Sequence, residues 1–122
     1  MRVAAIIVQN LIRLLFVILI ILGIMFWTGH ALNLIRLHMR LGELLVALLW
    51  ILAVLGIVKR VALAVPIIAL VWGVLVVYFG MHMMFMAPGV AREGVRVIHL
   101  LIGIVAIGLA EVMGGLLKRR AV

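Results

Sequence analysis

The sequence contains no cysteine among its 122 residues, and its only acidic residues are Glu43, Glu93 and Glu111. The absence of cysteine excludes disulfides, thiolate metal sites and covalently attached c-type haem. The chain also offers no activated serine or cysteine nucleophile, so nothing in it suggests hydrolysis.

Charged residues of either sign are scarce: 11% of the chain is charged and 70% is hydrophobic. A soluble domain could not bury that much apolar surface, so the composition indicates an integral membrane protein. A membrane-spanning helix needs roughly 20 apolar residues. Four such segments fit, at about Leu11–Leu32, Leu37–Val58, Val61–Met86 and Val95–Leu117. We therefore expect a single all-α transmembrane domain over residues 1–122, an up-down-up-down four-helix bundle in the lipid bilayer.

The net charge of +8 comes from basic residues that mark the helix ends instead of forming a patch for nucleic acid. Seven of them fall on the side of the two termini: Arg2, Arg13, Lys59, Arg60, Lys118, Arg119 and Arg120. Four fall on the other side: Arg36, Arg40, Arg92 and Arg96. By the positive-inside rule both termini are expected in the cytoplasm, for a multi-pass protein of the inner (plasma) membrane. The start lacks a small-residue cleavage site, so the first helix is expected to be retained.

The two halves of the sequence resemble each other. "LHMRLG" opens the second expected helix and "IHLLIG" opens the fourth, each with a histidine followed by a glycine four residues later. The first helix ends in "FWTGH" and the third in "YFGMH". These matches predict a repeat of two hairpins, although membrane composition alone can produce matches this short. The segment "MAPGVAREG" predicts a loop between the third and fourth helices.

The four histidines, His30, His38, His82 and His99, lie toward the outer ends of the expected helices, one on each helix. We expect this end on the periplasmic or extracellular side. A histidine near the headgroups can stay hydrated, so incidental contact with lipid is the alternative for each of them. Neutral imidazoles on facing helices of a bundle are also common ligands of haem iron. The set therefore predicts a haem site at the outer end.

Small residues accompany two of these histidines. Gly42 lies one turn below His38, and Gly103 lies one turn below His99, each pair on one helix face. A glycine directly under a ligating histidine would make room for a flat macrocycle. Gly42 and Gly103 are therefore candidate cofactor-binding residues, with ordinary helix packing as the alternative.

Arginines accompany the same two histidines. Arg36 and Arg40 flank the one on the second helix, and Arg96 lies one turn before the one on the fourth. The planar guanidinium group suits carboxylates, so Arg40 and Arg96 are candidates to hold haem propionates. The alternative is that the arginines pair with Glu43 and Glu93, or with lipid phosphates.

The second and fourth helices of such a bundle are diagonal neighbours, as are the first and third. Because their sequence contexts match, His38 and His99 are the preferred axial pair. His30 and His82 could ligate a second haem, line a quinone pocket or bond a propionate. Two haems at one depth do not fit side by side in a four-helix core, so we expect one haem b.

The motifs "LHMRLG", "IHLLIG", "GH" and "GMH" resemble those of small integral-membrane b-type cytochromes, in which antiparallel helices carry a bis-histidine haem. The resemblance implies electron transfer, between membrane quinone and a partner on the outer side. Because little chain remains outside the membrane, we expect a subunit of a larger complex or a homo-oligomer rather than a stand-alone enzyme.

Several alternatives remain open. Bacteriochlorophyll could replace haem, because a single histidine can ligate either. The run "MHMMFM" around His82 offers thioether and imidazole ligands that suit copper(I), although methionine is also adaptable apolar filling. A structural or accessory subunit without a cofactor is a further reading. Glu111 in the last helix is a functional candidate as an intramembrane acid, which could snorkel to Lys118 or relay protons.

Overall fold

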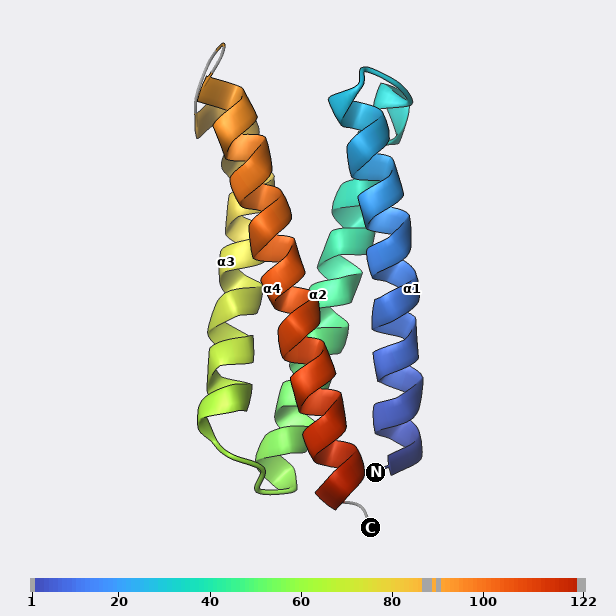
Figure 1. Cartoon of the computed structure of the whole chain (residues 1–122), viewed down its shortest axis with the longest axis vertical. Coiled ribbons are helices and arrows are strands. Elements are labelled where there is room, and N and C mark those ends of the chain that lie inside the picture. Colours follow the sequence, from blue (N-terminus) through green and yellow to red (C-terminus); the bar gives the residue numbers. More distant parts are fainter. Residues whose placement is uncertain (1, 87–88, 90, 121–122) are drawn as a thin grey trace.

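The computed structural model describes residues 2–86, 89 and 91–120. Within them the chain forms no strand and four α-helices: α1 (Arg2–Trp27), α2 (Ile35–Val58), α3 (Ala64–Met86) and α4 (Ala91–Arg120), with a short 3-10 turn η1 (Leu32–Leu34) before α2. Consecutive helices run in opposite directions, so α1 begins and α4 ends at the same end of the bundle (Figure 1). We call this end the terminal end and the opposite end the distal end.

Each of the four helices is long and apolar enough to cross a membrane. The prediction of an all-helical chain with four candidate spans is therefore confirmed. The bounds of all four helices differ from the prediction at one end or both, and the starts differ most in the first and last helices. The first begins at Arg2 instead of Leu11, and the last begins at Ala91 instead of Val95. Much of the predicted "MAPGVAREG" loop is thus helical, and Pro88 lies outside the described residues.

The end of α1 explains the sequence "TGH". The N–H of Gly29 donates to the carbonyl of Phe26 at 3.0 Å, and the N–H of His30 donates to that of Met25 at 2.7 Å. These two bonds form a Schellman cap, which requires a left-handed residue, and Gly29 has φ 82°. The helix therefore ends at Trp27, earlier than the predicted Leu32, and Gly29 has a backbone role.

The turn between α2 and α3 uses the same cap without a glycine. The N–H of Val61 donates to the carbonyl of Gly56 at 3.0 Å, and that of Arg60 donates to Ile57 at 3.1 Å. Arg60 occupies the left-handed position, with φ 56°. Pro66 then lies in the first turn of α3, where its missing N–H costs no helical hydrogen bond. The predicted tight turn at "VKRVA" is thus observed.

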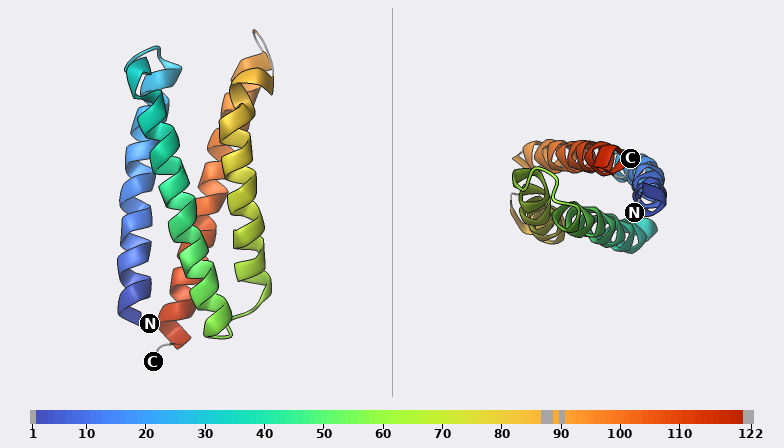
Figure 2. Two further views of the ribbon diagram at one scale, coloured as in Figure 1. Left: turned by 180° about the vertical axis from the view of Figure 1, so that it is seen from behind. Right: turned by 90° about the horizontal axis from the view of Figure 1, so that it is seen from below.

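The helices pair into two hairpins, α1–α2 and α3–α4, which lie side by side (Figure 2). Contacts across their interface join α2 to α3, α1 to α4, and α2 to its diagonal neighbour α4. We call this surface the hairpin interface. The predicted diagonal placement of the second and fourth helices is observed.

The packed core occupies the terminal part of the bundle. Its buried residues include Ile12, Leu49, Leu52, Ala110, Met113 and Leu117. Among the described residues, none beyond Leu22, Leu45, Gly73 and Ala106 toward the distal end is fully buried. The two hairpins diverge in the same direction (Figures 1 and 2). The distal part of the hairpin interface is therefore the place where a ligand could lie between helices.

Gly73 holds α3 against α2, which gives a first prediction. A β-carbon at Gly73 would overlap Nε1 of Trp50 and lie 2.9 Å from Cγ1 of Val46. The indole would have to move and lose its hydrogen bond to the Leu70 carbonyl, at 3.2 Å. We expect Gly73→Ala to destabilise the protein by about 1–3 kcal/mol, as overpacking does. Thermal unfolding in detergent measures the effect.

Gly94→Ala is the matched control, because a β-carbon at Gly94 has no described neighbour within 4 Å. It should leave the melting temperature unchanged or raise it, since alanine favours the helix. Equal melting temperatures for the two variants would contradict the close packing of α2 and α3.

Candidate functional site

Two of the four histidines meet in the distal half of the hairpin interface. The ring centres of His38 on α2 and His99 on α4 lie 6.3 Å apart. In each ring Nδ1 is buried and has no hydrogen-bond partner within the described part of the chain. A buried polar atom without a partner costs free energy, and such atoms are rare in native structures. This pair is therefore the strongest candidate for a ligand site.

A glycine in the other helix of the same hairpin lies opposite each ring. A β-carbon at Gly23 on α1 would lie 3.8 Å from Cε1 of His38. One at Gly80 on α3 would lie 3.4 Å from Cε1 of His99, at the near limit of van der Waals contact. Each imidazole is thus supported by its own hairpin, in an arrangement common to both halves of the bundle.

Phenylalanines flank the same two rings. Phe26 meets His38 edge to face, with ring centres 5.4 Å apart. Phe79 lies parallel to His99, with ring centres 6.0 Å apart and planes 6° apart. These apolar neighbours restrict the rings and reduce their access to water.

The spacing of the two rings suits coordination of one ion between them. An ion bound about 2 Å from a nitrogen of each imidazole would separate the ring centres by about 6 Å. The observed separation is 6.3 Å, with the ring planes tilted by 57°. Neutral imidazole is a common ligand of zinc, copper and iron, so the spacing alone does not choose among these metals.

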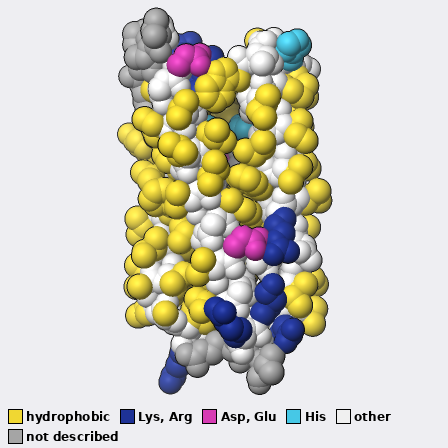
Figure 3. Space-filling model, in the orientation of Figure 1, with side chains coloured by type: hydrophobic (Ala, Val, Ile, Leu, Met, Phe, Trp, Pro, Cys, Tyr) yellow, Lys and Arg dark blue, Asp and Glu magenta, His cyan; other side chains and the backbone are white. Residues whose placement is uncertain are grey.

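There is room beside the pair for a larger group. β-Carbons at Gly42 and Gly103 would have no described neighbour within 4 Å. A separate cleft of about 840 Å³ opens between the start of α2 and the end of α3; it is lined in part by Arg36, Met39 and Met81, and by neither histidine of the pair. On the α1–α4 side, a histidine is visible at the bottom of a hollow between the hairpins (Figure 3). The distal hairpin interface is thus open on the α1–α4 side, where a histidine can be seen.

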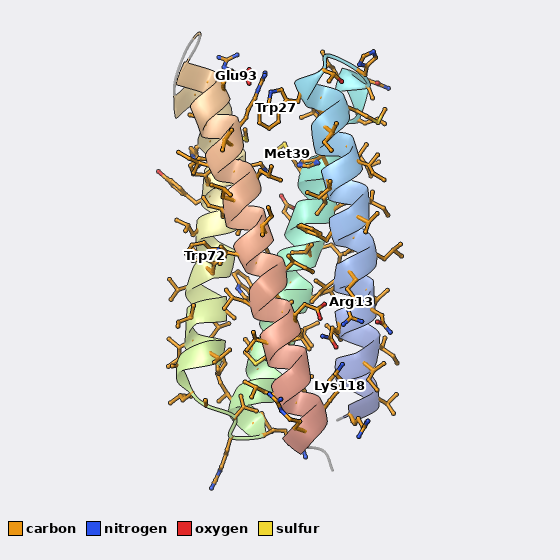
Figure 4. All side chains as sticks on the ribbon, in the orientation of Figure 1. Arg13, Trp27, Met39, Trp72, Glu93 and Lys118 are labelled. Atoms are coloured by element: carbon orange, nitrogen blue, oxygen red, sulfur yellow. The ribbon has the colours of Figure 1, made fainter. Side chains whose placement is uncertain are left out.

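The predicted arginine sites both contact glutamates of their own helix. Arg40, which also lines the cleft, lies 3.4 Å from Glu43. Arg96 lies 2.8 Å from Glu93, which also accepts a hydrogen bond of 2.7 Å from Nε1 of Trp27. Trp27 therefore links the end of α1 to the start of α4 at the distal end (Figure 4). Both ion pairs are partly exposed, and pairs of this kind contribute little to stability.

The structure does not bring His30 and His82 together. Both side chains are exposed, and each has its polar contact with a residue two to four positions earlier in the chain. Nδ1 of His30 lies 3.0 Å from Oγ1 of Thr28. Nδ1–H of His82 donates to the carbonyl of Tyr78 at 2.8 Å, and the two rings stack with centres 4.3 Å apart. In residues 2–86, 89 and 91–120, no three residues among histidine, cysteine, aspartate and glutamate cluster as a metal site.

The methionines predicted as copper ligands are only partly described, because the side chains of Met84 and Met86 lie outside the described part of the structure. Met81 lines the cleft between α2 and α3. His82 and Met81 both carry exposed side chains.

Glu111 was expected to extend toward Lys118 or to relay protons, but the hydrogen bonds of its carboxylate come from α1. Its carboxylate accepts bonds of 2.6 and 2.7 Å from Nε and one terminal nitrogen of Arg13. It also accepts a bond of 3.0 Å from the amide of Gln9, whose side chain is buried. Sequence reasoning missed this cluster because Arg13 was counted only as an interfacial charge.

No protein-family model matches the chain, and no curated protein or solved structure matches it.

Proposed function

We propose that the chain is a membrane b-type haem protein that transfers electrons, with His38 and His99 as the axial ligands of one haem. The observation that carries the proposal is the pair of facing imidazoles, 6.3 Å apart, each with a buried Nδ1 that has no described partner. The rings come from diagonal helices and are each supported by the opposite member of their own hairpin.

Two further observations favour a flat, anionic group over a bare metal ion. First, only two potential ligands from the described part of the chain meet here, whereas a structural zinc site usually has four. A porphyrin supplies four equatorial nitrogens, so two axial imidazoles complete the coordination of its iron. Second, the open positions at Gly42 and Gly103 leave room on the helix faces below the two rings, and Arg96, one turn before His99, is a cationic partner for the carboxylates of a macrocycle.

The residues of this chain would have distinct tasks. A bound haem would supply a one-electron redox couple. His38 and His99 would bind as neutral imidazoles, while Phe26 and Phe79 keep water from them. Arg40 and Arg96 would hold the carboxylates, and a propionate would compete with Glu43 for Arg40 and with Glu93 for Arg96.

The charge distribution sets the proposed orientation. Without Arg13, which lies within α1, six basic residues on the terminal side still outnumber four on the distal side, so we propose that both termini lie in the cytoplasm and the histidines near the outer face of the plasma membrane. Electrons would pass between membrane quinone and a partner at that face. The scarcity of chain outside the spans favours work within a complex or oligomer.

An absorption spectrum of the purified protein, expressed with an adequate haem supply, tests the proposal. We expect a Soret band and sharp α and β bands after reduction, with one haem per chain by pyridine haemochrome assay. Far-red bands would instead identify bacteriochlorophyll, and a featureless spectrum with copper by elemental analysis would identify the copper alternative. A featureless spectrum without metal would overturn the proposal and leave a structural subunit.

A further inference from the structure

A partly exposed ion pair lies in the terminal half of the bundle. Arg13 on α1 and Glu111 on α4 share two hydrogen bonds, of 2.6 and 2.7 Å. Their side chains are nevertheless 48% and 40% exposed. Arg13 also donates a bond of 3.0 Å to Oδ1 of Asn10, which is exposed on the same helix. We call Asn10, Arg13 and Glu111 the polar patch.

The polar patch lies well inside the candidate membrane spans. Counting 1.5 Å per residue, Arg13 is about 16 Å along α1 from Arg2, and Glu111 is about 13 Å along α4 from Arg120. Figure 3 shows an acidic and a basic side chain in contact near mid-height, with hydrophobic side chains above them and further basic side chains toward the terminal end, and Figure 4 shows Arg13 extending from α1 toward α4. Half-exposed charges at this depth would face lipid unless another protein surface covers them.

Charge in contact with hydrocarbon is costly, and intramembrane ionisable residues usually face protein or water. An ion pair within one chain would suffice to join α1 and α4. However, the exposed parts of both charged groups would then lie in lipid without a polar neighbour. The patch itself indicates the partner, because it carries one cation and one anion at similar depths. A two-fold axis along the membrane normal would bring Arg13 of each copy next to Glu111 of the other.

We propose that the α1–α4 face, centred on the polar patch, is the contact through which two copies of this chain form a symmetric dimer. The contact is isologous, because one patch of both signs complements itself. The helix surface around Glu111 allows close approach, since Gly108 and Gly115 lie on its face at i−3 and i+4 and β-carbons there would have no described neighbour within 4 Å. The proposal is independent of haem binding.

Complementary charge reversals distinguish a contact between two copies from an ion pair that only joins α1 to α4 within one chain. Arg13→Glu and Glu111→Arg each break the internal pair and create repulsion in a homodimer. Mixed in one membrane, the two variants can restore opposite charges across the interface, although each chain's own pair stays broken. We therefore expect each variant alone to be monomeric in mild detergent, with at least a tenfold loss of dimer, and the two differently tagged variants to copurify when coexpressed.

A second measurement retains the native charges, in case the reversals do not insert. The chain has no cysteine, so single-cysteine variants can be cross-linked in membranes with a short bis-maleimide. Asn10→Cys should give a cross-linked dimer, whereas Val74→Cys, on an exposed position of α3, should not. A wild-type protein that is monomeric in membranes, equal cross-linking at both positions, or failure of inserted reversal variants to pair would each overturn the proposal.

Discussion

Replacing either His38 or His99 with alanine is expected to abolish the low-spin haem spectrum of the purified protein. Each ring would be an axial ligand, and removal of one leaves the iron five-coordinate and weakly held between diverging hairpins. We expect at least a tenfold loss of haem occupancy in each variant. The Soret position and the reduced α band, measured on protein of equal yield, give the result.

His30→Ala and His82→Ala are the controls, because both rings are exposed and lie away from the pair. They should retain full occupancy and an unchanged spectrum. If His38→Ala and His99→Ala kept a six-coordinate spectrum while a control lost it, the axial assignment would be wrong. If all four variants kept it, no single histidine would be required and the haem would be held elsewhere.

Apolar runs were enough to predict the fold class, because a chain with this composition must satisfy its backbone hydrogen bonds within helices. The helix ends were less predictable. The first span was predicted to begin at Leu11, yet α1 begins at Arg2, and Gln9 in the added turns is buried and donates a hydrogen bond to Glu111 of α4. A contact between residues 102 positions apart leaves no local signal.

The pairing of His38 and His99 could be predicted from matching contexts and bundle topology, and the structure brings these two rings together. Whether they bind haem stays a prediction. The glycines opposite the rings, Gly23 and Gly80, were missed because packing across helices cannot be predicted from spacing along one helix. The predicted match of "FWTGH" with "YFGMH" also pairs unlike glycines, since Gly29 caps α1 whereas Gly80 lies within α3.

The proposed dimer contact and the proposed haem site lie at different depths of the bundle. Around Ile12, Leu49 and Met113 the hairpins are held together by apolar packing, and the α1–α4 face beside this core carries the polar patch. In the distal half, packing gives way to the histidine pair between the diverging hairpins. A bound haem would thus join the two hairpins where the bundle has no buried residue among those described. Because a ligand that binds the folded state stabilises it, we expect the haem-bound form to unfold at a higher temperature than the free form.

Gly103→Leu is expected to prevent haem binding while leaving the helices folded and inserted. Gly103 lies one turn below His99 on the same face, and a β-carbon there meets no described atom within 4 Å, so leucine clashes with nothing in the chain itself. Leucine also favours both the helix and the bilayer. It would, however, fill the space that a macrocycle ligated by His99 requires.

Gly94→Leu makes the same change at an open, exposed position near the start of α4, on a different face from His99, and should keep its haem. Haem stoichiometry and gel-filtration volume, measured on the same preparations, separate the possible roles of Gly103. Loss of haem with an unchanged elution volume is expected, because the substitution acts on the cofactor alone. Full occupancy in Gly103→Leu would mean that no macrocycle lies against α4 below His99, and a changed elution volume with full occupancy would assign Gly103 to contact between helices or subunits.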